Sequence, residues 1–231
     1  MSLYFDIHSH QKSKIDPDCA RCNNVSQREF SIFENIPNEP NQFYSVGLHP
    51  WYITETNWES DLEQLEQILP NKKIIALGEC GLDNLCGVEI KLQEKAFIAQ
   101  LKLAEKYDLP VVVHCVRAYN ELVRIVKNEK NETQIIVHGF QSKLSILKTL
   151  LIAGFHISVG AAVLQNTKID WVETLKTVPD TSFFLETDDN DIPIELIYER
   201  LAQLKNISVD NLKEIIEENI EQVFRQKIKT N

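Results

Sequence analysis

The amino-acid sequence predicts an α/β protein with a parallel β-sheet, because two kinds of segment alternate along it. Short apolar runs rich in β-branched and aromatic residues have the length of strands. Stretches whose apolar residues recur at helical spacing separate most of these runs. This alternation favours a parallel sheet, and strands that are apolar throughout indicate burial on both faces. The expected strands span residues 4–7, 43–46, 74–77, 111–113, 135–137, 155–159 and 183–185.

The first part of the chain interrupts this alternation. Residues 11–42 contain Pro17, Pro37 and Pro40 together with several Asn and Ser, and they show no convincing helical pattern. We therefore expect an irregular loop around one short second strand near residues 20–25. The first helix should be shortened or absent.

Later segments show clear helical spacing, for example Leu62, Leu65 and Ile68 in one of them. The clearest predicted helix is the last, where Ser208 is a typical N-cap residue. Its apolar stripe consists of Leu212, Ile215, Ile216, Ile220, Val223 and Phe224. This helix should pack against the outer face of the sheet.

The length of the chain predicts one domain, residues 1–231. A (β/α)₈ barrel of roughly 200 to 250 residues would use the whole chain as a single unit. A doubly wound open sheet has the same periodicity, so periodicity alone leaves both architectures open.

The acidic composition excludes one class of nucleic-acid binder. The formal net charge is −10, which is the wrong sign for a protein that holds long nucleic acid by neutralising many phosphates. A nuclease that acts on a strand end is still compatible, because bound divalent ions can supply positive charge where it is needed.

The sequence also predicts a cytoplasmic protein with no membrane partner. The N-terminus lacks the pattern of a signal peptide, and no later segment approaches the ~18 apolar residues of a membrane span. The five cysteines form an odd, unevenly spaced set, which favours a reducing compartment. Cys19 and Cys22 have the spacing of half a zinc site but lack a second pair, so we interpret them as incidental. No protein partner can be inferred.

Side chains that bind metals recur where the predicted strands end. Five of the six histidines lie at or beside such an end, and His156 is the exception. The strand ends of an α/β barrel gather at one face, so residues far apart in sequence can meet there. The candidate metal ligands are His8, His10, Glu79, His114, His138 and Asp188.

The residue types and spacing fit a site for two divalent ions. His8 and His10 point to the same side of an extended strand, because side chains alternate with a period of two. Glu79 has two carboxylate oxygens and can bridge two cations, while His114 and His138 can complete the second coordination sphere. Mixed imidazole and carboxylate ligands suit Zn²⁺, Mn²⁺ or Ni²⁺ and, less well, Mg²⁺.

The segments that carry these residues resemble the motifs of the TatD family of metal-dependent hydrolases. The resemblance spans nearly the whole chain and extends to Asn219 and Phe224 near its end. The matching segments are Phe5-Asp-Ile-His-Ser-His10, Val46-Gly-Leu-His-Pro50, Leu77-Gly-Glu-Cys-Gly-Leu-Asp83, Leu109-Pro-Val-Val-Val-His114, Val137-His-Gly-Phe140 and Leu185-Glu-Thr-Asp188.

This resemblance implies a distorted TIM (β/α)₈ barrel and deoxyribonuclease activity, in which a water activated by two divalent metals cleaves phosphodiester bonds. His8 and His10 would bind the first metal, His114 and His138 the second, and Glu79 both. Asp188 would bind the first metal and take a proton from the attacking water. The catalytic residues that the resemblance implies are Asp188, Glu79 and His49. The partner implied is DNA, as a single strand or a strand end.

Two departures from the family pattern concern the substrate. The family usually has an arginine two residues after the histidine of the fifth strand, but here Val116 takes that place and Arg117 follows. His49 and Arg117 are the candidate substrate contacts. The segment that begins at Asp188 is unusually acidic for a surface that faces phosphate.

These departures favour an alternative, an amidohydrolase-like enzyme that acts on a small amide, ester or lactone. A third possibility is a metal-binding module without catalytic activity. That possibility predicts the loss of ligands, and all six candidate ligands are present.

Overall fold

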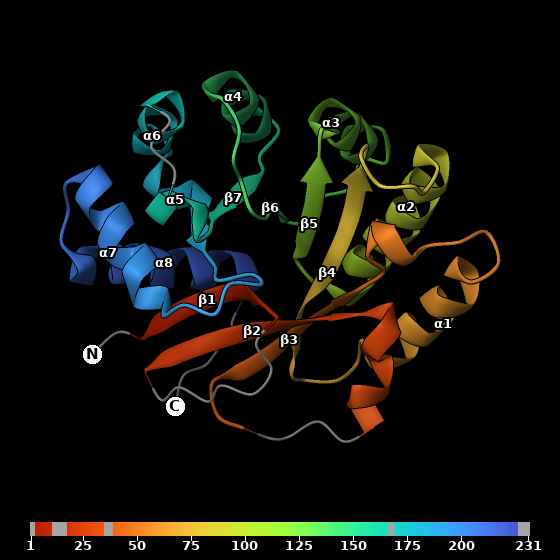
Figure 1. The fold of residues 1–231 in the computed structure, drawn as a ribbon. Helices are drawn as coiled ribbons and strands as arrows, with labels where there is room; N and C mark the ends of the chain where they lie inside the picture. The colour runs from red at the N-terminus through yellow and green to blue at the C-terminus, as the bar shows by residue number, and fades with distance from the viewer. Residues whose placement is uncertain (1–2, 11–17, 35–38, 166–168, 226–231) are drawn as a thin grey trace.

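Eight parallel strands form one sheet that curls into a nearly closed barrel (Figure 1). The structure is a computed structural model that describes residues 3–10, 18–34, 39–165 and 169–225. The strands pair in chain order, each with the next. They are β1 (Tyr4–Ser9), β2 (Cys19–Ser26), β3 (Gln42–Gly47), β4 (Ile74–Asp83), β5 (Val111–Val116), β6 (Ile135–Val137), β7 (His156–Val159) and β8 (Phe183–Leu185).

The last strand returns to the first, which separates a barrel from an open doubly wound sheet. A parallel bridge joins Ser9 and Asp188. The amide of Asp188 donates to the carbonyl of His8 at 2.9 Å, and the amide of His10 donates to the carbonyl of Asp188 at 3.2 Å. The distorted TIM barrel that the family resemblance implies is therefore confirmed.

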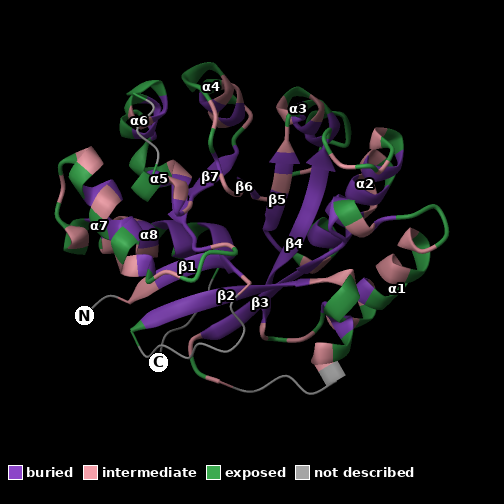
Figure 2. Ribbon diagram, viewed as in Figure 1, coloured by how far each residue is buried: buried purple, intermediate pink, exposed green. Residues whose placement is uncertain are grey.

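Helices surround the strands (Figure 1). The α-helices of the described chain are α1 (Trp58–Ile68), α2 (Ile90–Tyr107), α3 (Tyr119–Asn128), α4 (Leu144–Ile152), α5 (Ala162–Gln165), α6 (Ile169–Lys176), α7 (Ile194–Lys205) and α8 (Val209–Phe224). Three short 3₁₀ helices accompany them, η1 (Gln27–Glu34), η2 (Pro50–Tyr52) and η3 (Asp180–Ser182). The strands are buried while the helices expose their outer faces (Figure 2).

The connection that follows β2 is irregular, as the sequence predicts for part of residues 11–42. A 3₁₀ helix, η1, follows β2 where a regular unit would have an α-helix. Residues 11–17 and 35–38 of the predicted loop lie outside the described residues. The second strand is longer than expected, because β2 spans eight residues. Polar residues such as Arg21 and Asn24 lower its apparent strand propensity, yet both are buried and have partners on the neighbouring strands β1 and β3.

The final helix begins as predicted. The Ser208 side chain accepts a hydrogen bond from the amide of Asn211 and caps α8. The predicted apolar stripe is buried except for Ile215, which packs against the core while partly exposed. Within the described chain, no helix combines the length and the apolar character needed to cross a membrane.

Candidate metal centre

The carboxyl ends of the strands bring the predicted ligands into one pocket. His8 lies on β1, His10 follows it, Glu79 lies on β4 and His114 on β5. His138 follows β6 and Asp188 follows β8, while His49 precedes η2. His8 is fully buried beneath the pocket, whose volume is about 580 Å³. The side chains that line it include His10, His49, Glu79, His114, His138 and Asp188.

Glu79 stands at the centre, and its two oxygens face different imidazoles. Oε2 lies 3.4 Å from His8 Nε2 and 3.7 Å from His10 Nε2. Oε1 lies 2.7 Å from His114 Nδ1 and 2.8 Å from His138 Nε2. The carboxylate therefore separates two sets of nitrogen ligands and is within reach of both.

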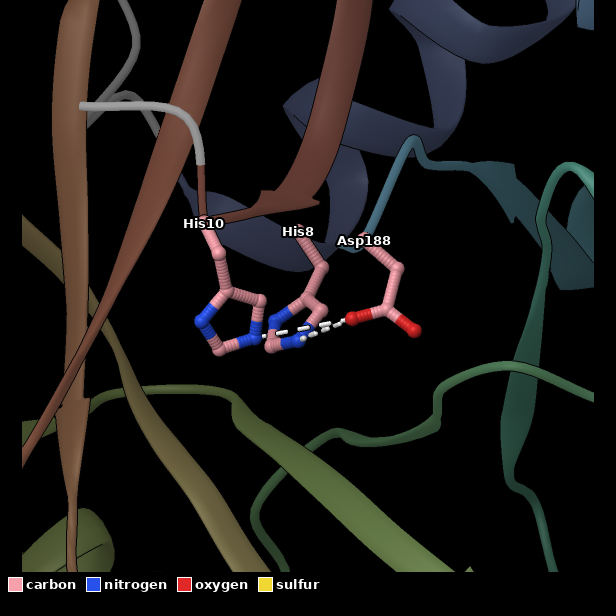
Figure 3. Close-up of side chains that lie close together, drawn as sticks. All are labelled: His8, His10 and Asp188. Atoms are coloured by element: carbon pink, nitrogen blue, oxygen red, sulfur yellow. Dashed lines mark ion pairs between the residues drawn. The ribbon is translucent and has the colours of Figure 1, made fainter. Parts of the chain in front are cut away.

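Asp188 completes the first set from the opposite side. Its Oδ1 lies 3.7 Å from His8 Nε2 and 3.5 Å from His10 Nε2, and all three side chains point to one spot (Figure 3). The candidate ligand atoms of His8, His10 and Asp188 lie within 4.8 Å of one another, as do those of His8, Glu79 and His138. A third such group contains His49, Glu79 and His114.

In the part of the chain that the structure describes, several buried ring nitrogens of the cluster lack a hydrogen-bond partner, which fits a site that binds cations. Among the described residues, neither ring nitrogen of His8 has a hydrogen-bond partner, and the same is true of His138 Nδ1. A buried polar atom without a partner is costly, and a cation coordinated by His8 would remove that cost. The donors are imidazole nitrogens and carboxylate oxygens, the ligands of Zn²⁺ and related ions.

The carboxylates and imidazoles of the cluster strongly shift one another's pKa values. Burial by itself would raise the pKa of Glu79, but the imidazoles of His138, His10 and His114 outweigh it and hold that pKa well below its usual value. Burial opposes a charge on His138, yet Glu79 and Glu186 raise its pKa well above the usual value. Without metal, a proton on His138 neutralises the negative charge that a bound cation would otherwise neutralise.

Asp188 is a better proton acceptor than an ordinary aspartate. Burial raises its pKa above the usual value, and the carboxylates of Glu186 and Glu79 act in the same direction. The neighbouring His8 and His138 oppose this effect. A raised pKa suits a group that takes a proton from water.

Two glycines in β4 allow the backbone to place Glu79 in the cluster. A Cβ on Gly78 would lie 2.3 Å from the carbonyl oxygen of Val112, and one on Gly81 would lie 2.1 Å from that of His114. Both glycines also have φ of +140°. Only glycine lets β4 approach β5 this closely, which fixes Glu79 beside His114.

The orientation of His49 follows from its backbone contact. Its Nδ1 accepts a hydrogen bond from the amide of Trp51 at 3.2 Å and therefore carries no proton. The proton of the neutral ring lies on Nε2, which donates to Glu79 Oε1 at 3.2 Å. In this tautomer His49 is a hydrogen-bond donor at the edge of the cluster.

Sequence reasoning missed Asn24, which holds Glu79 in place. The Asn24 amide donates to Glu79 Oε2 at 3.3 Å, and its Oδ1 accepts from the amide of Glu79 at 2.7 Å. A polar residue inside the predicted strand 20–25 was the available signal.

Two further carboxylates orient the histidines. Asp83 Oδ2 lies 3.2 Å from His114 Nε2, and Glu186 Oε1 lies 3.6 Å from His138 Nδ1. Glu186 is fully buried and accepts hydrogen bonds from the amide of Gly139 and the hydroxyl of Ser158. Carboxylates behind ligating histidines fix the orientation of the ring. Glu186 is thus a buried neighbour of His138.

The structure places the remaining candidates away from the cluster. Arg117 is exposed just after β5 and is not among the residues that line the pocket, whereas Arg28 from η1 is. His156 is buried against Gln134 and Phe184. Cys19 and Cys22 are buried and form no disulfide. Burial raises the pKa of Cys22 to about 12, so this sulfur is a poor metal ligand.

Comparison with known proteins identifies the family. The family model described as "TatD related DNase" matches residues 6–225. The chain belongs to the TatD family. As a TatD protein it is a metal-dependent hydrolase, and the site above supplies groups that can bind metal.

Relatives of this TatD protein match much of its sequence. "Uncharacterized metal-dependent hydrolase YjjV" of Escherichia coli is 33% identical over 156 residues, which cover 66% of this chain and 60% of the relative. An uncharacterized metal-dependent hydrolase of Haemophilus influenzae is 28% identical over 222 residues, 87% of this chain and 84% of the relative.

Solved structures support the same fold. The crystal structure of YjjV superposes with a TM-score of 0.80 at 24% identity and covers 96% of this chain and 97% of YjjV. A TatD family hydrolase from Entamoeba histolytica gives a TM-score of 0.75 at 17% identity, with 97% of this chain and 98% of that protein covered.

Proposed function

We propose that this TatD protein is a deoxyribonuclease that hydrolyses phosphodiester bonds with two divalent cations. The observation that supports this most is the position of Glu79, whose two oxygens face two separate sets of imidazoles. A bridging carboxylate between two ligand sets is typical of sites in which paired metals hydrolyse phosphate esters.

Five residues besides Glu79 would hold the ions. His8, His10 and Asp188 would bind the first ion, and His114 and His138 the second. When bound, two such cations lower the pKa of water and neutralise charge on phosphoryl oxygens. Zn²⁺, Mn²⁺ and Ni²⁺ suit these ligands best, and Mg²⁺ is less well matched.

The protein's own residues have distinct roles in this proposal. Asp188, whose carboxylate faces His8 and His10 in the first ligand set, would take the proton of the attacking water. His49 carries its proton on Nε2, and once Glu79 Oε1 binds an ion this N–H would be free to donate to the substrate or its leaving group. Glu79 holds both ions at fixed positions, because Asn24 restrains its carboxylate and its backbone amide.

The proposed substrate is a single strand or a strand end. The net charge of −10 disfavours binding along a duplex. None of the five cysteines, all of which lie in the described part of the chain, forms a disulfide, which fits the reducing cytoplasm that we propose as its location.

The test is hydrolysis of single-stranded DNA by metal-free protein supplied with Mn²⁺, Zn²⁺, Ni²⁺ or Mg²⁺. We expect cleavage that EDTA abolishes and metal restores. Asp188→Asn should lower kcat by about 10²-fold or more, since it removes the proton acceptor. Arg124→Ala, on the outer helix α3, should cleave as the parent does. Full turnover by Asp188→Asn would contradict the proposal.

A second candidate is hydrolysis of a small amide, ester or lactone on the same scaffold. Asp189 lines the pocket, and a second acid beside Asp188 favours a substrate less anionic than DNA. A parallel screen of single-stranded DNA, cyclic amides, esters and lactones with each metal separates the two candidates. Metal-dependent turnover of a neutral substrate without DNA cleavage would favour the second.

A further inference from the structure

One wall of the pocket presents an aromatic side chain that the metal cluster does not use. Trp51 in η2 lines the pocket and is 52% exposed. Large exposed aromatic side chains beside a cavity are typical of binding surfaces. Its ring contacts the buried His49 and the partly exposed His114, which both belong to the cluster.

The indole of Trp51 is held in a fixed orientation. Its Nε1 donates to Asp83 Oδ2 at 2.6 Å, and Asp83 in turn accepts from the amide of Leu85 at 2.7 Å. The ring meets His49 edge-on at 5.0 Å and His114 at 5.7 Å between ring centroids. An exposed aromatic face at a fixed place beside the cluster needs little ordering when a flat ligand stacks on it.

A cation stands on the same wall. The guanidinium carbon of Arg28 lies 4.8 Å from the centre of the Tyr52 ring. Gln27, its neighbour in η1, donates to the carbonyl of His49 at 3.2 Å and accepts from the amide of His49 at 2.8 Å. These hydrogen bonds join η1 to His49, the residue that directly precedes η2 with Trp51 and Tyr52.

Arg28 differs in charge from its surroundings. Among the described residues that line the pocket, it is the one lysine or arginine, while Glu29, Glu79, Asp188 and Asp189 are acidic. An anionic substrate entering this acidic pocket would be attracted to Arg28 as well as to bound cations. A volume of about 580 Å³ exceeds what one phosphate needs and suits a nucleotide.

We propose that Trp51, Tyr52 and Arg28 form a nucleotide subsite beside the scissile phosphodiester. A nucleobase stacks on the exposed face of Trp51, and Arg28, supported by Tyr52, binds an oxygen of the neighbouring phosphate. Bases within a duplex already stack on both faces, so this subsite selects single strands and frayed ends. The inference rests on the proposed nuclease function and names the part of the substrate that is recognised.

The first test compares two substrates with the metal-loaded enzyme. One is a ten-residue oligothymidylate, and the other carries abasic residues on both sides of the cleaved bond. We expect the parent to prefer the base-containing strand in kcat/KM, and Trp51→Leu to lower that preference about tenfold. Trp51→Phe should keep most of it, because the ring persists while the hydrogen bond to Asp83 is lost.

Arg28 is tested with the same two substrates. Arg28→Ala should raise KM for both strands to a similar degree, since it contacts phosphate and not base. Arg117→Ala is the informative comparison, because the sequence predicts a phosphate contact for Arg117. A loss confined to Arg117→Ala would overturn the role of Arg28.

A binding measurement provides a readout independent of turnover. Oligothymidylate should quench the fluorescence of Trp51 in the presence of EDTA, and Trp51→Leu should abolish this part of the quenching. Quenching that Trp51→Leu leaves unchanged would overturn the stacking role.

These outcomes separate the two proposals. If the parent hydrolyses no phosphodiester with any metal, the nuclease function fails. If it cleaves DNA but every variant keeps the parent's preference for bases and its KM, the nuclease function stands and the nucleotide subsite fails.

Discussion

His156 differs from the other five histidines in its surroundings. It is buried away from the cluster, and its Nε2 lies 3.1 Å from Gln134 Oε1. Burial lowers its pKa below the usual 6.5. The folded protein therefore holds this ring neutral, while the unfolded chain protonates it near pH 6.5.

This difference predicts a dependence of stability on pH. Between the folded and unfolded pKa values the unfolded chain binds more protons, so the free energy of unfolding decreases as pH falls below about 6.5. His156→Gln should reduce that decrease by removing the titrating group. Urea unfolding at pH 7.5 and 5.5 measures it in both proteins. Identical decreases in the two would show that His156 does not contribute.

Among single residues, the candidate ligands could be proposed from the sequence, but most of the residues that support them could not. The candidate ligands recur at strand ends, and this pattern can be recognised in the sequence alone. Asn24, Asp83 and Glu186 support them through contacts between separate strands, and the sequence does not show which residues those contacts join. Arg28 could not be found either, because its position depends on η1 and on Gln27.

Among the elements, β4 has the strictest local requirement. A Cβ on Gly81 would also lie 2.9 Å from Val113 Cγ1, in addition to its clash with the His114 carbonyl. No flexible side-chain end can relieve a clash with backbone. The loop that follows β4 is far more tolerant, since a Cβ on Gly87 would meet nothing within 4 Å.

We predict that Gly81→Ala destabilises the protein by more than about 1 kcal/mol, through both the clash and the positive φ. Gly87→Ala is the matched control and should change the free energy of unfolding by less than about 1 kcal/mol. Chemical denaturation of both variants measures the difference. Equal effects would mean that β4 can move away from β5 at no cost.

In addition to its apolar stripe, helix α8 is held to the barrel by the side-chain amide of Asn219. Asn219 Nδ2 donates to the carbonyls of Asp180 at 2.7 Å and Phe183 at 2.9 Å. Asn219→Ala should cost about 1–3 kcal/mol, because it leaves buried acceptors unpaired. Glu218→Ala, on the exposed face, is the control and should be nearly neutral. Thermal unfolding of both variants tests this, and a neutral Asn219→Ala would refute it.

The regular elements followed from periodicity, whereas the first unit did not. The α8 stripe and its Ser208 cap are local patterns, and both were predictable. The full length of β2 was not, because Arg21 and Asn24 are stabilised there by Asp6 on β1 and Glu79 on β4. Pairing between distant segments overrides local propensity.

For the whole molecule, the metal centre should contribute to stability. Ions that bind only the folded state at a free concentration of 100 times Kd add about 2.7 kcal/mol. For a protein of this size, that raises Tm by roughly 5–11 °C. Calorimetry with EDTA and with added Mn²⁺ or Zn²⁺ measures the shift, and Glu79→Gln should reduce it. A Tm that is the same with and without metal would argue against the site.

The architecture could be narrowed from the sequence but not fixed by periodicity. Open sheets and barrels share the same alternation, and the family resemblance favoured the barrel. What distinguishes them is the contact between β1 and the segment after β8, which lie at opposite ends of the chain. That residues 1–231 form one domain stays a prediction.

The bridge between Ser9 and Asp188 has a consequence for biogenesis. His8 and His10 leave the ribosome well before Asp188, which lies 178 residues after His10. A nascent chain that stops before β8 lacks both the seam of the barrel and the third member of its first ligand set. The first ligand set can therefore assemble only after β8 and Asp188 have been synthesised.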